Sequence, residues 1–487
     1  METQTQAPEK EKEGAFSNIS TKSFLFVVGL LCAILAISGI LSYIVPQGTF
    51  LRDENGLIIP DAFTQGEVKG IAVWRIFTAP FRVFASSDNV TIIMISVFLL
   101  IMSGVFNLLD KTGGIRMVIA KIMQRFSKKR KTVICITVLA FMAFGSFFGL
   151  FEELVTLLPI VILFMLSLGL DTMTGLGACL MAACFGFSAA ITNPFSVGLI
   201  PEQAAALNLN FSVSDGVWLR ILLFVTIYIA VCAFLFWHMR KIEKQPSTSP
   251  TFDIDNQKRQ TLQADNQLSE TDNGKFKIFS GFFLFQFIIL VLIAAIRAIS
   301  GYAIPILAAS FLIGGIVCGL LVCEKKKDVF KHISTGAVAM LPAVVMIAIA
   351  SSVKLVMQES GIMDTVMHAA ISAFEGKSAF TCILLLYFLI LFLQLFIGSA
   401  SAKIFLIMPI ILPVATAIGI PPTLVTLTYC IADGFTDVIL PTNPVLLIGL
   451  SMANVSYGKW VKWTWKIQLI IFTLTILFLL FGVAIGY

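Results

Sequence analysis

Long runs of apolar residues, separated by short polar segments, dominate the chain. Seven of these runs are about 20 residues long, the length that an α-helix needs to cross the hydrocarbon core of a bilayer. They cover residues 23–45, 90–109, 215–239, 277–299, 303–323, 334–357 and 464–486. The pattern predicts an all-α membrane protein that crosses the bilayer several times.

Two further apolar segments, residues 172–206 and 423–455, are interrupted near their middle by the same tripeptide. Residues 192–194 and residues 442–444 both read Thr-Asn-Pro. Proline lacks a backbone N–H and its ring clashes with the preceding turn, so each helix should break at this point. Irregular backbone at membrane depth is tolerated only where it is buried in protein or lines a cavity. The tripeptides therefore predict two broken transmembrane helices and a candidate site.

The broken helices belong to an internal repeat, because the interval from Pro159 to Pro194 equals the interval from Pro409 to Pro444. Ahead of each broken helix lies a pair of shorter apolar arms joined by a polar or glycine-bearing tip. Arms this short predict re-entrant hairpins, which enter and leave the membrane by one face; the alternative is that each arm is an ordinary span. The predicted hairpins cover residues 132–168 and 379–418.

Lysine and arginine are concentrated in the segments that face the cytoplasm if the N-terminus lies inside and the chain crosses nine times. The predicted inside segments are 110–131, 240–276, 324–333 and 456–463. The predicted outside segments, which are poorer in these residues, are 46–88, 207–214, 300–302 and 359–378. An odd number of crossings then separates corresponding spans of the two repeats, so the repeats are inverted relative to each other. Inverted repeats with broken helices at the bilayer midplane are the architecture of secondary transporters.

The chain therefore divides into two halves joined by a linker. A polar cytoplasmic tail, residues 1–22, precedes the first half at 23–241, and the second half covers 277–487. Residues 242–276 include a stretch rich in Ser, Thr, Asp, Asn and Gln, which predicts a flexible cytoplasmic linker. The start of the chain lacks the short apolar core of a cleavable signal peptide. We expect a multi-pass protein of the inner (cytoplasmic) membrane with a cytoplasmic N-terminus.

Composition excludes several other classes. Hydrophobic residues make up 58% of the chain and charged residues only 13%. The net charge of +6 lies in loops between apolar runs, so it reflects topology and not a nucleic-acid surface. The nine cysteines and three histidines form no metal-binding pattern, and no nucleophile–base pair or nucleotide loop is present. We expect no metal site, no cofactor beyond a coupling ion, and no enzyme activity; the expected contacts are membrane lipid and a small-molecule substrate.

The two breaks supply the first candidate site residues. Thr192, Asn193, Thr442 and Asn443 carry hydroxyl and amide groups that can ligate Na⁺ or hydrogen-bond a carboxylate. The ends of the half-helices add exposed N–H groups, which favour anions, and carbonyls, which favour cations. A sodium site near Asn193 and Asn443 is one possibility. The alternative is that both breaks are helix kinks whose backbone groups are satisfied by neighbouring helices.

Charged residues inside the apolar region supply the second set. Glu152 and Glu153 lie at the first hairpin tip, and Lys403 lies at the second. Asp433 and Asp437 are one turn apart on the second broken helix and share a face. Ionisable groups at this depth are costly and usually functional, so the four carboxylates are candidates for binding a coupling ion or proton. The alternative is that Lys403 pairs with the aspartates only to hold helices together.

Two serines at the second hairpin tip complete the candidates. Ser399 and Ser401 are surrounded by small residues, which allow a ligand to approach backbone N–H groups closely. Such a tip suits a carboxylate, whereas the excess of acidic residues requires a cation: Na⁺, H⁺ or a basic substrate. A site with both features would suit an amino acid, which carries a carboxylate and an ammonium group. Arg297 and Lys354, near outer ends of spans, are interpreted as structural residues whose side chains extend to the interface.

Residues 398–409 and residues 432–444 resemble the C4-dicarboxylate anaerobic carrier-like family, which includes proteins similar to arginine/ornithine antiporters and belongs to the ion transporter superfamily. The likeness extends from the first span to Trp465. It implies a homodimer in which a transport domain holding both hairpins moves against a scaffold domain in an elevator-like way. The first tip, residues 147–153, lacks the Ser-Asn-Thr trio typical of the superfamily. By the resemblance, Ser399 and Ser401 at the second tip, with Asn193 and Asn443 at the breaks, line substrate and cation sites.

These observations predict a secondary active transporter for a small organic carboxylate, such as a C4-dicarboxylate, or an amino acid, coupled to Na⁺ or H⁺. One alternative is a basic amino-acid antiporter of the arginine/ornithine type. An ion channel is the alternative from another class, and it would not need an inverted pair of hairpins.

Overall fold

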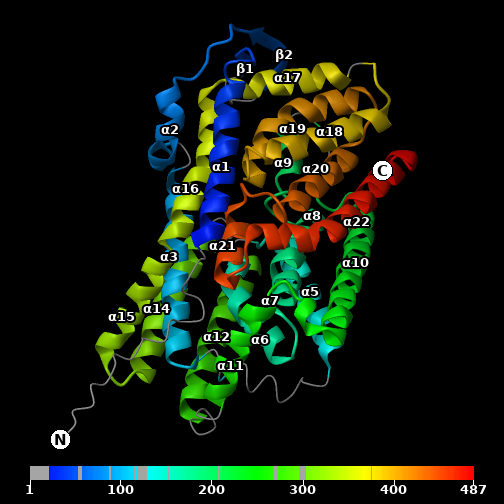
Figure 1. Cartoon of the computed structure of the whole chain (residues 1–487). Coiled ribbons are helices and arrows are strands. Elements are labelled where there is room, and N and C mark those ends of the chain that lie inside the picture. Colours follow the sequence, from blue (N-terminus) through cyan, green and yellow to red (C-terminus); the bar gives the residue numbers. More distant parts are fainter. Residues whose placement is uncertain are drawn as a thin grey trace, which may run out of the picture.

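The computed structural model describes residues 21–487 except 53–57, 87–88, 115–116, 118–128, 152, 207–208, 210, 267–272, 296–302 and 375. The described chain is almost entirely helical, which confirms the all-α membrane fold (Figure 1). The seven predicted long spans are found as α1 (Thr21–Leu41), α3 (Asn89–Lys111), α10 (Val217–Lys244), α12 (Asn273–Ala295), α14 (Ala303–Val322), α16 (Leu341–Glu359) and α22 (Tyr457–Ala484).

The first predicted hairpin consists of two helical arms joined by a glycine turn. Helix α5 (Arg130–Ala143) continues as a π-helical turn, η2 (Phe144–Phe148). Gly149 then adopts a left-handed conformation with φ of 68°, which only glycine adopts without strain. The chain returns through a 3-10 helix, η3 (Glu153–Leu157), and α6 (Leu158–Ser167).

The second predicted hairpin consists of α18 (Ala379–Gln394) and α19 (Ala400–Ala417). In Figure 1, α18 and α19 lie in the upper part of the molecule, whereas α6 and α7 lie in the lower part. Within the described residues, seven helices are long and apolar enough to cross a membrane, and they include α19 and α5 with its π-helical extension. Length alone therefore does not separate a hairpin arm from a full span, and the inverted arrangement stays a prediction.

Both predicted interruptions are present. The first broken helix runs through α7 (Thr172–Leu176), a π-helical turn η4 (Gly177–Met181) and α8 (Ala182–Ser188), and helix resumes at α9 (Ile200–Ala206). The second runs through α20 (Pro422–Asp437) and resumes at α21 (Pro444–Ala453). Pro444 occupies the first turn of α21, where its missing N–H costs nothing.

The two broken helices touch each other where α8 meets α20. The Ser188 hydroxyl donates a hydrogen bond to the Ile431 carbonyl at 3.0 Å. A Cβ atom on Gly434 would lie 2.3 Å from the Ser188 backbone nitrogen, which is too close for any side chain. The glycine therefore lets the two backbones approach.

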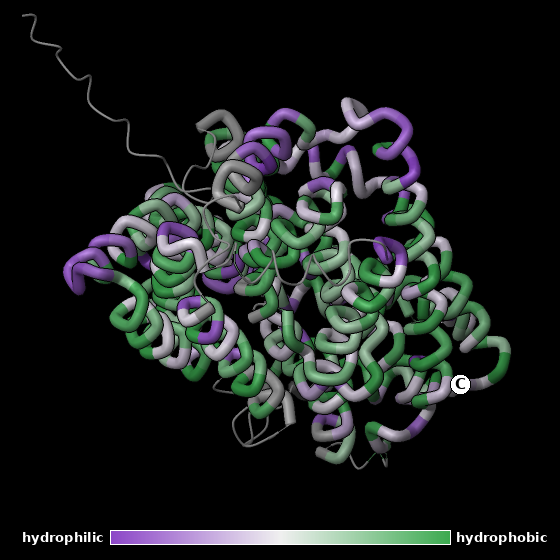
Figure 2. The backbone as a smooth tube through the Cα atoms, turned by 90° about the horizontal axis from the view of Figure 1, so that it is seen from below, coloured by the Kyte–Doolittle hydropathy of each residue, from purple (hydrophilic) through white to green (hydrophobic). Residues whose placement is uncertain are grey.

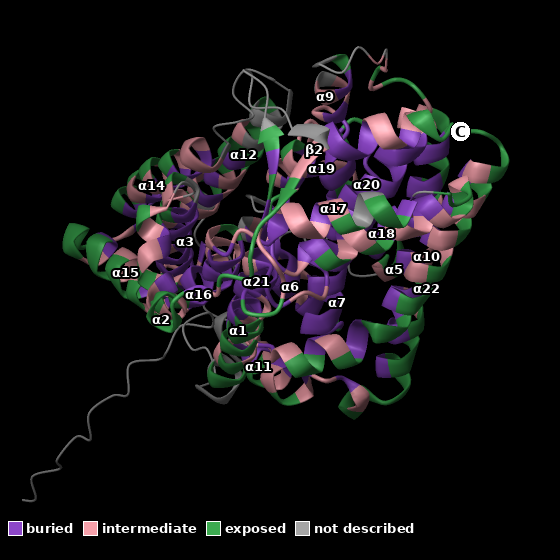
Figure 3. Ribbon diagram, turned by 90° about the horizontal axis from the view of Figure 1, so that it is seen from above, coloured by how far each residue is buried: buried purple, intermediate pink, exposed green. Residues whose placement is uncertain are grey.

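A second group of helices packs around α3. Helix α15 (Lys326–Ala339) lies against it, and the Ser103 hydroxyl donates to the Gly336 carbonyl at 2.8 Å. Helices α14 and α16 also contact α3, and α1 packs on α16. Buried residues gather along α7 and α20, while the outer faces of α14 and α15 are partly or fully exposed (Figure 3).

A small cap of mixed structure covers one end of the molecule. Strands β1 (Gly48–Arg52) and β2 (Ile58–Gln65) pair antiparallel, next to α17 (Met363–Phe374). The ring of Phe63 stacks on His368 of α17 at 4.0 Å between centroids. Helix α2 (Val73–Arg82) and the 3-10 turn η1 (Val83–Ala85) follow. In Figure 1 this cap lies at the end opposite to α11 (Phe252–Asn266) and α15.

The linker prediction needs a correction. Of the predicted flexible segment 242–276, residues 246–266 form the short 3-10 helix η5 (Pro246–Thr248) and α11. Ser249, Thr251 and Asp255 are buried, although their composition is typical of disorder. Their polar groups are satisfied by residues far away in the sequence.

A hydrogen-bond network holds this linker. Asp171, which caps the start of α7, accepts bonds from Ser249 at 2.7 Å and from His238 of α10 at 2.8 Å. Asp255 accepts from Thr172 at the start of α7 and from Thr251. Hydrophilic positions of this kind lie mainly at turns and helix ends, whereas most helices are hydrophobic along their length (Figure 2). The network therefore fixes the linker to the start of the first broken helix.

Candidate functional site

A cavity of about 360 Å³ lies between the second hairpin, the second break and the helices α3, α14 and α16. Its polar lining comes mainly from the hairpin tip, α20 and the start of α21, and its apolar lining from α3 and the first half. The lining residues are Ile92, Met94, Ile95, Gly149, Phe151, Phe187, Phe195, Ile304, Pro305, Ala350, Ser351, Lys354, Phe396, Gly398, Ser399, Ala400, Ser401, Ala402, Asp433, Asp437, Thr442, Asn443, Pro444 and Val445.

Six of the predicted site residues come together in this cavity. They belong to three segments that are separate in the sequence: the second hairpin tip, the end of α20 and the residues before α21. They are Ser399, Ser401, Asp433, Asp437, Thr442 and Asn443. These six residues, all from the second half of the chain, therefore share one cavity.

The two predicted residues at the first break lie outside the cavity lining. The Thr192 hydroxyl donates to the Phe147 carbonyl at 2.9 Å, and the Asn193 side-chain oxygen accepts from the Phe195 N–H at 2.9 Å. These bonds join the first break to the first hairpin tip and to its own turn. The first break reaches the cavity through Phe195 instead.

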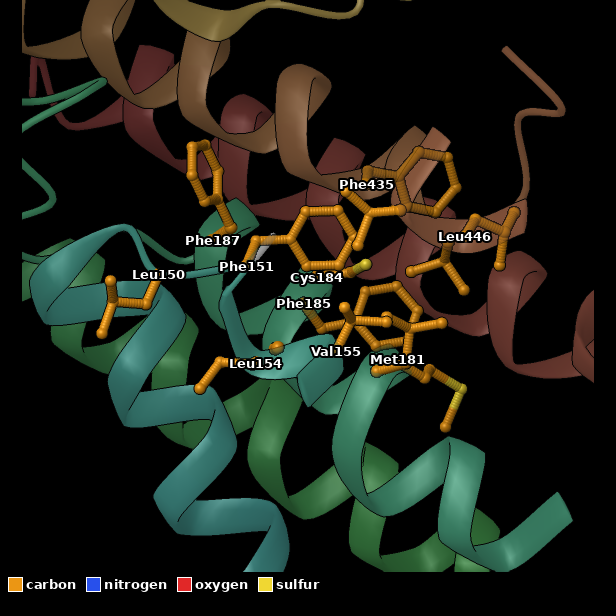
Figure 4. Close-up of a cluster of buried hydrophobic side chains, with 14 of the residues drawn as sticks. Leu150, Phe151, Leu154, Val155, Met181, Cys184, Phe185, Phe187, Phe435 and Leu446 are labelled. Atoms are coloured by element: carbon orange, nitrogen blue, oxygen red, sulfur yellow. The ribbon is translucent and has the colours of Figure 1, made fainter. Parts of the chain in front are cut away.

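The predicted acidic pair at the first tip cannot be placed in the same way. Glu152 lies outside the described residues, as does the side chain of Glu153, whose backbone begins η3. Their neighbours Leu150, Phe151 and Leu154 are buried. Figure 4 shows Phe151 beside Phe187, close to Phe435 of α20, in a cluster that continues to Val155 and Leu446. The first tip thus packs through apolar side chains.

Lys403 pairs with Asp433, as predicted for a charge partner. The Lys403 ammonium and the Asp433 carboxylate form an ion pair, and their side chains are 0% and 1% exposed. Asp433 lines the cavity, whereas Lys403 does not. The pair joins the first turn of α19 to the middle of α20.

Asp437 is held by two amide groups and not by a cation. Its Oδ1 atom accepts a hydrogen bond from Gln394 Nε2 at 2.8 Å and another from Asn443 Nδ2 at 2.7 Å. Gln394 ends α18 and escaped the sequence analysis, although a lone amide in the apolar run 380–397 is a recognisable signal. The two bonds fix the orientation of the carboxylate.

Asn443 has two roles at once. Its side-chain oxygen caps α21 by accepting from the N–H groups of Val445 at 2.9 Å and Leu446 at 3.2 Å. Its amide nitrogen donates to Asp437 at the end of α20. One side chain therefore bridges the two half-helices across the break.

Two helices begin at the cavity and one ends there. Helix α19 starts behind Ser399, whose hydroxyl accepts from the Ala402 N–H at 3.4 Å, and α21 starts behind Asn443. The N-terminal end of a helix carries a partial positive charge and favours anions, while the C-terminal end favours cations. Helix α20 ends at Asp437, so the cavity has one end that suits an anion and another that suits a cation.

Lys354 of α16 also lines the cavity and adds positive charge. The sequence analysis interpreted this lysine as a structural residue reaching the interface, and its place in the cavity wall makes it a candidate for contact with a solute as well. Its single position in a long apolar helix gave no motif by which it could be assigned to the site.

Arg220 of α10 is a further residue that the sequence analysis missed. It is 2% exposed and donates from Nη1 to the Ile191 carbonyl at 2.7 Å and from Nη2 to the Asp215 carbonyl at 3.1 Å. It thus satisfies an exposed carbonyl at the first break, as irregular backbone in a membrane requires.

No group of three or more His, Cys, Asp and Glu side chains that could hold a metal is found among the described residues. A Na⁺ site near Asn193 and Asn443 therefore remains an expectation, resting on oxygen ligands of other kinds.

The fold and the cavity define a class: a multi-pass helical membrane protein with a solute-sized, charged cavity at an interrupted helix. The sequence places the chain in a family of that class. The chain belongs to the C4-dicarboxylate anaerobic carrier (DcuC) family, whose model matches residues 24–484. It is therefore a membrane transporter of this type.

Two bacterial proteins are similar to this chain at low sequence identity. A Haemophilus influenzae protein of uncharacterized function is 28% identical over 371 residues, which cover 76% of this chain and 71% of the relative. The Escherichia coli K12 protein YfcC, provisionally named a basic amino acid antiporter, is 23% identical over 403 residues, covering 79% and 76%.

Two solved transporter structures show a distant likeness. The Alcanivorax borkumensis YdaH transporter aligns over 96% of this chain and 99% of its own, with 16% identity and a TM-score of 0.41. Neisseria gonorrhoeae MtrF, whose structure illuminates a class of antimetabolite efflux pumps, aligns over 95% of both chains, with 14% identity and a TM-score of 0.42.

Proposed function

We propose that the protein is a secondary active transporter that moves a small organic carboxylate or an amino acid across the cytoplasmic membrane, coupled to Na⁺ or H⁺. One observation supports this most directly. The cavity combines helix N-termini and Lys354 with the carboxylate of Asp437, so one solute can meet an anion-binding end and a cation-binding end.

The anion-binding end is formed by the tip of the second hairpin. A substrate carboxylate would accept from the Ser399 and Ser401 hydroxyls and the first free N–H groups of α19, with Lys354 facing it across the cavity. Hydrogen bonds to a charged group contribute about 1.5–3 kcal/mol each. The small residues Gly398 and Ala400 leave the backbone open to this approach.

The cation-binding end is formed by Asp437 and the last carbonyls of α20. It would hold a coupling Na⁺, a proton, or the ammonium group of an amino acid. Gln394 and Asn443 bind one oxygen of Asp437 and thereby orient the carboxylate. A C4-dicarboxylate would need a bound cation there, whereas an amino acid would bring its own.

The second candidate function is that of a basic amino-acid antiporter, with a basic amino acid as the substrate. The acidic residues Asp433 and Asp437 in the cavity wall favour it, and so does the name given to the YfcC relative. An ion channel is the candidate from another class; a solute-sized cavity with opposed charges favours a carrier over a pore.

An elevator-like movement would use the two groups of helices seen in the fold. Helices α3, α14, α15 and α16 would form the scaffold, and the hairpins with the broken helices would form the transport domain of each subunit of a homodimer. The cavity lies between these two groups.

The test is counterflow in proteoliposomes that contain the purified protein. Vesicles preloaded with unlabelled succinate or unlabelled arginine receive the same compound in labelled form, with and without Na⁺ and at two pH values. Saturable accumulation of one of the two labelled compounds supports transport and selects the substrate class. Exchange of neither compound would reject both substrate proposals, and conductance without saturation would favour a channel.

A further inference from the structure

The Lys403–Asp433 ion pair stands apart from other polar contacts near the cavity because it is completely enclosed. Neither side chain is more than 1% exposed. Apart from this pair, Lys403 Nζ and Asp433 Oδ1 have no hydrogen-bond partner among the described residues. Burying two charges costs several kcal/mol per ion, and a hydrophobic pair of the same volume is often as stable or more so. Stability alone therefore does not account for the pair.

The position of the lysine adds to this cost. Lys403 lies in the first turn of α19, which begins at Ala400. The start of a helix carries a partial positive charge, so a cation there is repelled by the helix to which it belongs. Asp433 is the carboxylate in direct contact that offsets both effects.

A metal cation bound at Asp433 would hold the hairpin tip against α20, but only while it was bound. Lys403 holds the two together without a metal. Here the tip is joined to α20 permanently, by the ion pair and by a hydrogen bond from the Tyr429 hydroxyl to the Ala400 carbonyl at 2.6 Å.

We propose that Lys403 is a resident cation that takes the place of a coupling Na⁺ at Asp433, so that Asp433 binds no Na⁺ and the second hairpin tip assembles on α20 without it. This rests on the proposed transport function, because the site is the one at the second hairpin. Asp433 is neutralised from within the protein. Asp437, which forms no ion pair within the described part of the chain, is left as the carboxylate that meets the solute.

The test measures Na⁺ binding directly and does not require the substrate. Purified full-length protein in detergent is titrated with NaCl against choline chloride, while radioactive sodium binding and the melting temperature are recorded. The wild type should show no saturable sodium binding, and no Na⁺-dependent shift in melting temperature, that D433N removes. K403A, which removes the ammonium and leaves Asp433 accessible from the cavity, should gain saturable sodium binding and a rise in melting temperature with Na⁺.

Two variants serve as controls. K403A with D433N should lose the gained binding, because the carboxylate is gone. K258A removes another buried lysine, which lies on α11 and donates to the Ala453 carbonyl at 3.2 Å, and it should gain no sodium binding.

Saturable sodium binding by the wild type that D433N removes would overturn the proposal, and so would a folded K403A protein that binds no sodium. If K403A does not fold, the comparison of wild type with D433N decides: a Na⁺-dependent rise in melting temperature that D433N removes contradicts a resident cation at Asp433, and its absence supports one. Failure of counterflow with every solute would reject the transport proposal and leave this measurement intact.

Discussion

Asn443 carries two different functions in one side chain, and these can be separated by substitution. It caps α21 and donates to Asp437. We expect Asn443→Ala to abolish uptake and to lower stability by about 1 kcal/mol, the usual cost of a lost N-cap. Uptake in proteoliposomes and melting temperature in detergent measure the two effects.

Asn443→Ser is the matched variant, because serine also caps helices but lacks the amide that donates to Asp437. It should keep most of the stability and still lose uptake. Normal uptake by Asn443→Ser would show that Asn443 only caps the helix.

Lys354 should contribute to substrate affinity through its charge. If it faces a substrate carboxylate, Lys354→Ala removes a charge-assisted bond of about 2 kcal/mol, which corresponds to a KM about 30-fold higher. Lys354→Arg, which keeps the charge, should retain more of the affinity than the alanine variant. An unchanged KM in both variants would assign Lys354 a structural role.

At the scale of residues, only one copy of the repeated motif reaches the cavity. Thr442 and Asn443 of the second Thr-Asn-Pro tripeptide lie in the cavity wall, whereas Thr192 and Asn193 of the first copy do not. Gln394 was missed and Lys354 was interpreted as structural, because each stands alone in an apolar helix and only the folded chain brings it to the site. For the same reason, the repeat gave no means of knowing that Asn193 would bond to its own turn.

Among the elements, the docked linker depends on Asp171. Burial by itself raises the pKa of this carboxyl, but hydrogen bonds from His238, Thr174 and Ser249, together with the charge of His238, lower the pKa to about 2. The ordinary value is 3.8. A folded-state pKa below the unfolded value contributes stability above the unfolded pKa, and this contribution disappears as the pH falls towards 2.

The shift corresponds to about 2 kcal/mol. Asp171→Asn should therefore lower the free energy of unfolding at pH 7 by roughly this amount. The variant should also lose less stability than the wild type when the pH falls from 4 to 2, because it has no carboxylate to protonate at this position. Thermal unfolding over this pH range measures both effects. Asp253→Asn, an exposed aspartate on the same linker, is the control and should change neither. A wild-type-like profile for Asp171→Asn would show that the network does not hold the linker.

The linker also shows why element prediction failed at this point. Its residues are those of a disordered segment, and their partners, such as Asp171 and the Ala453 carbonyl, lie far away in the sequence. Long apolar helices were predicted well because each one satisfies its own backbone within the segment.

The contact between the two broken helices makes a second prediction at this scale. A Cβ on Gly434 would lie 2.3 Å from the Ser188 nitrogen, so Gly434→Ala must push α8 and α20 apart. Overpacking of this kind costs about 1–3 kcal/mol. Gly458→Ala on α22 is the control, since a Cβ there meets nothing within 4 Å. Equal melting temperatures for the two variants would contradict close contact at Gly434.

For the whole molecule, the sequence predicted the all-helical membrane fold and both helix breaks, because hydrophobic length and proline act locally. The small strand pair near α17 was not predicted, since its pairing and its contact with His368 arise only in three dimensions. The prediction that the two repeats are inverted depends on the number of membrane crossings counted between them. An alternating-access mechanism relies on this inverted orientation.

That orientation can be tested with single cysteines at the entries of the two hairpins. Lys131 lies exposed at the start of α5, and Lys377 lies exposed just before α18. In a background where all nine native cysteines are replaced, Lys131→Cys should react with a membrane-impermeant maleimide only from the cytoplasmic side and Lys377→Cys only from the outside. Inverted hairpins require this opposite labelling, because each one enters and leaves by a single face. Labelling of both cysteines from the same side of intact cells would mean that the repeats are parallel, and a carrier mechanism based on inverted repeats would then be untenable.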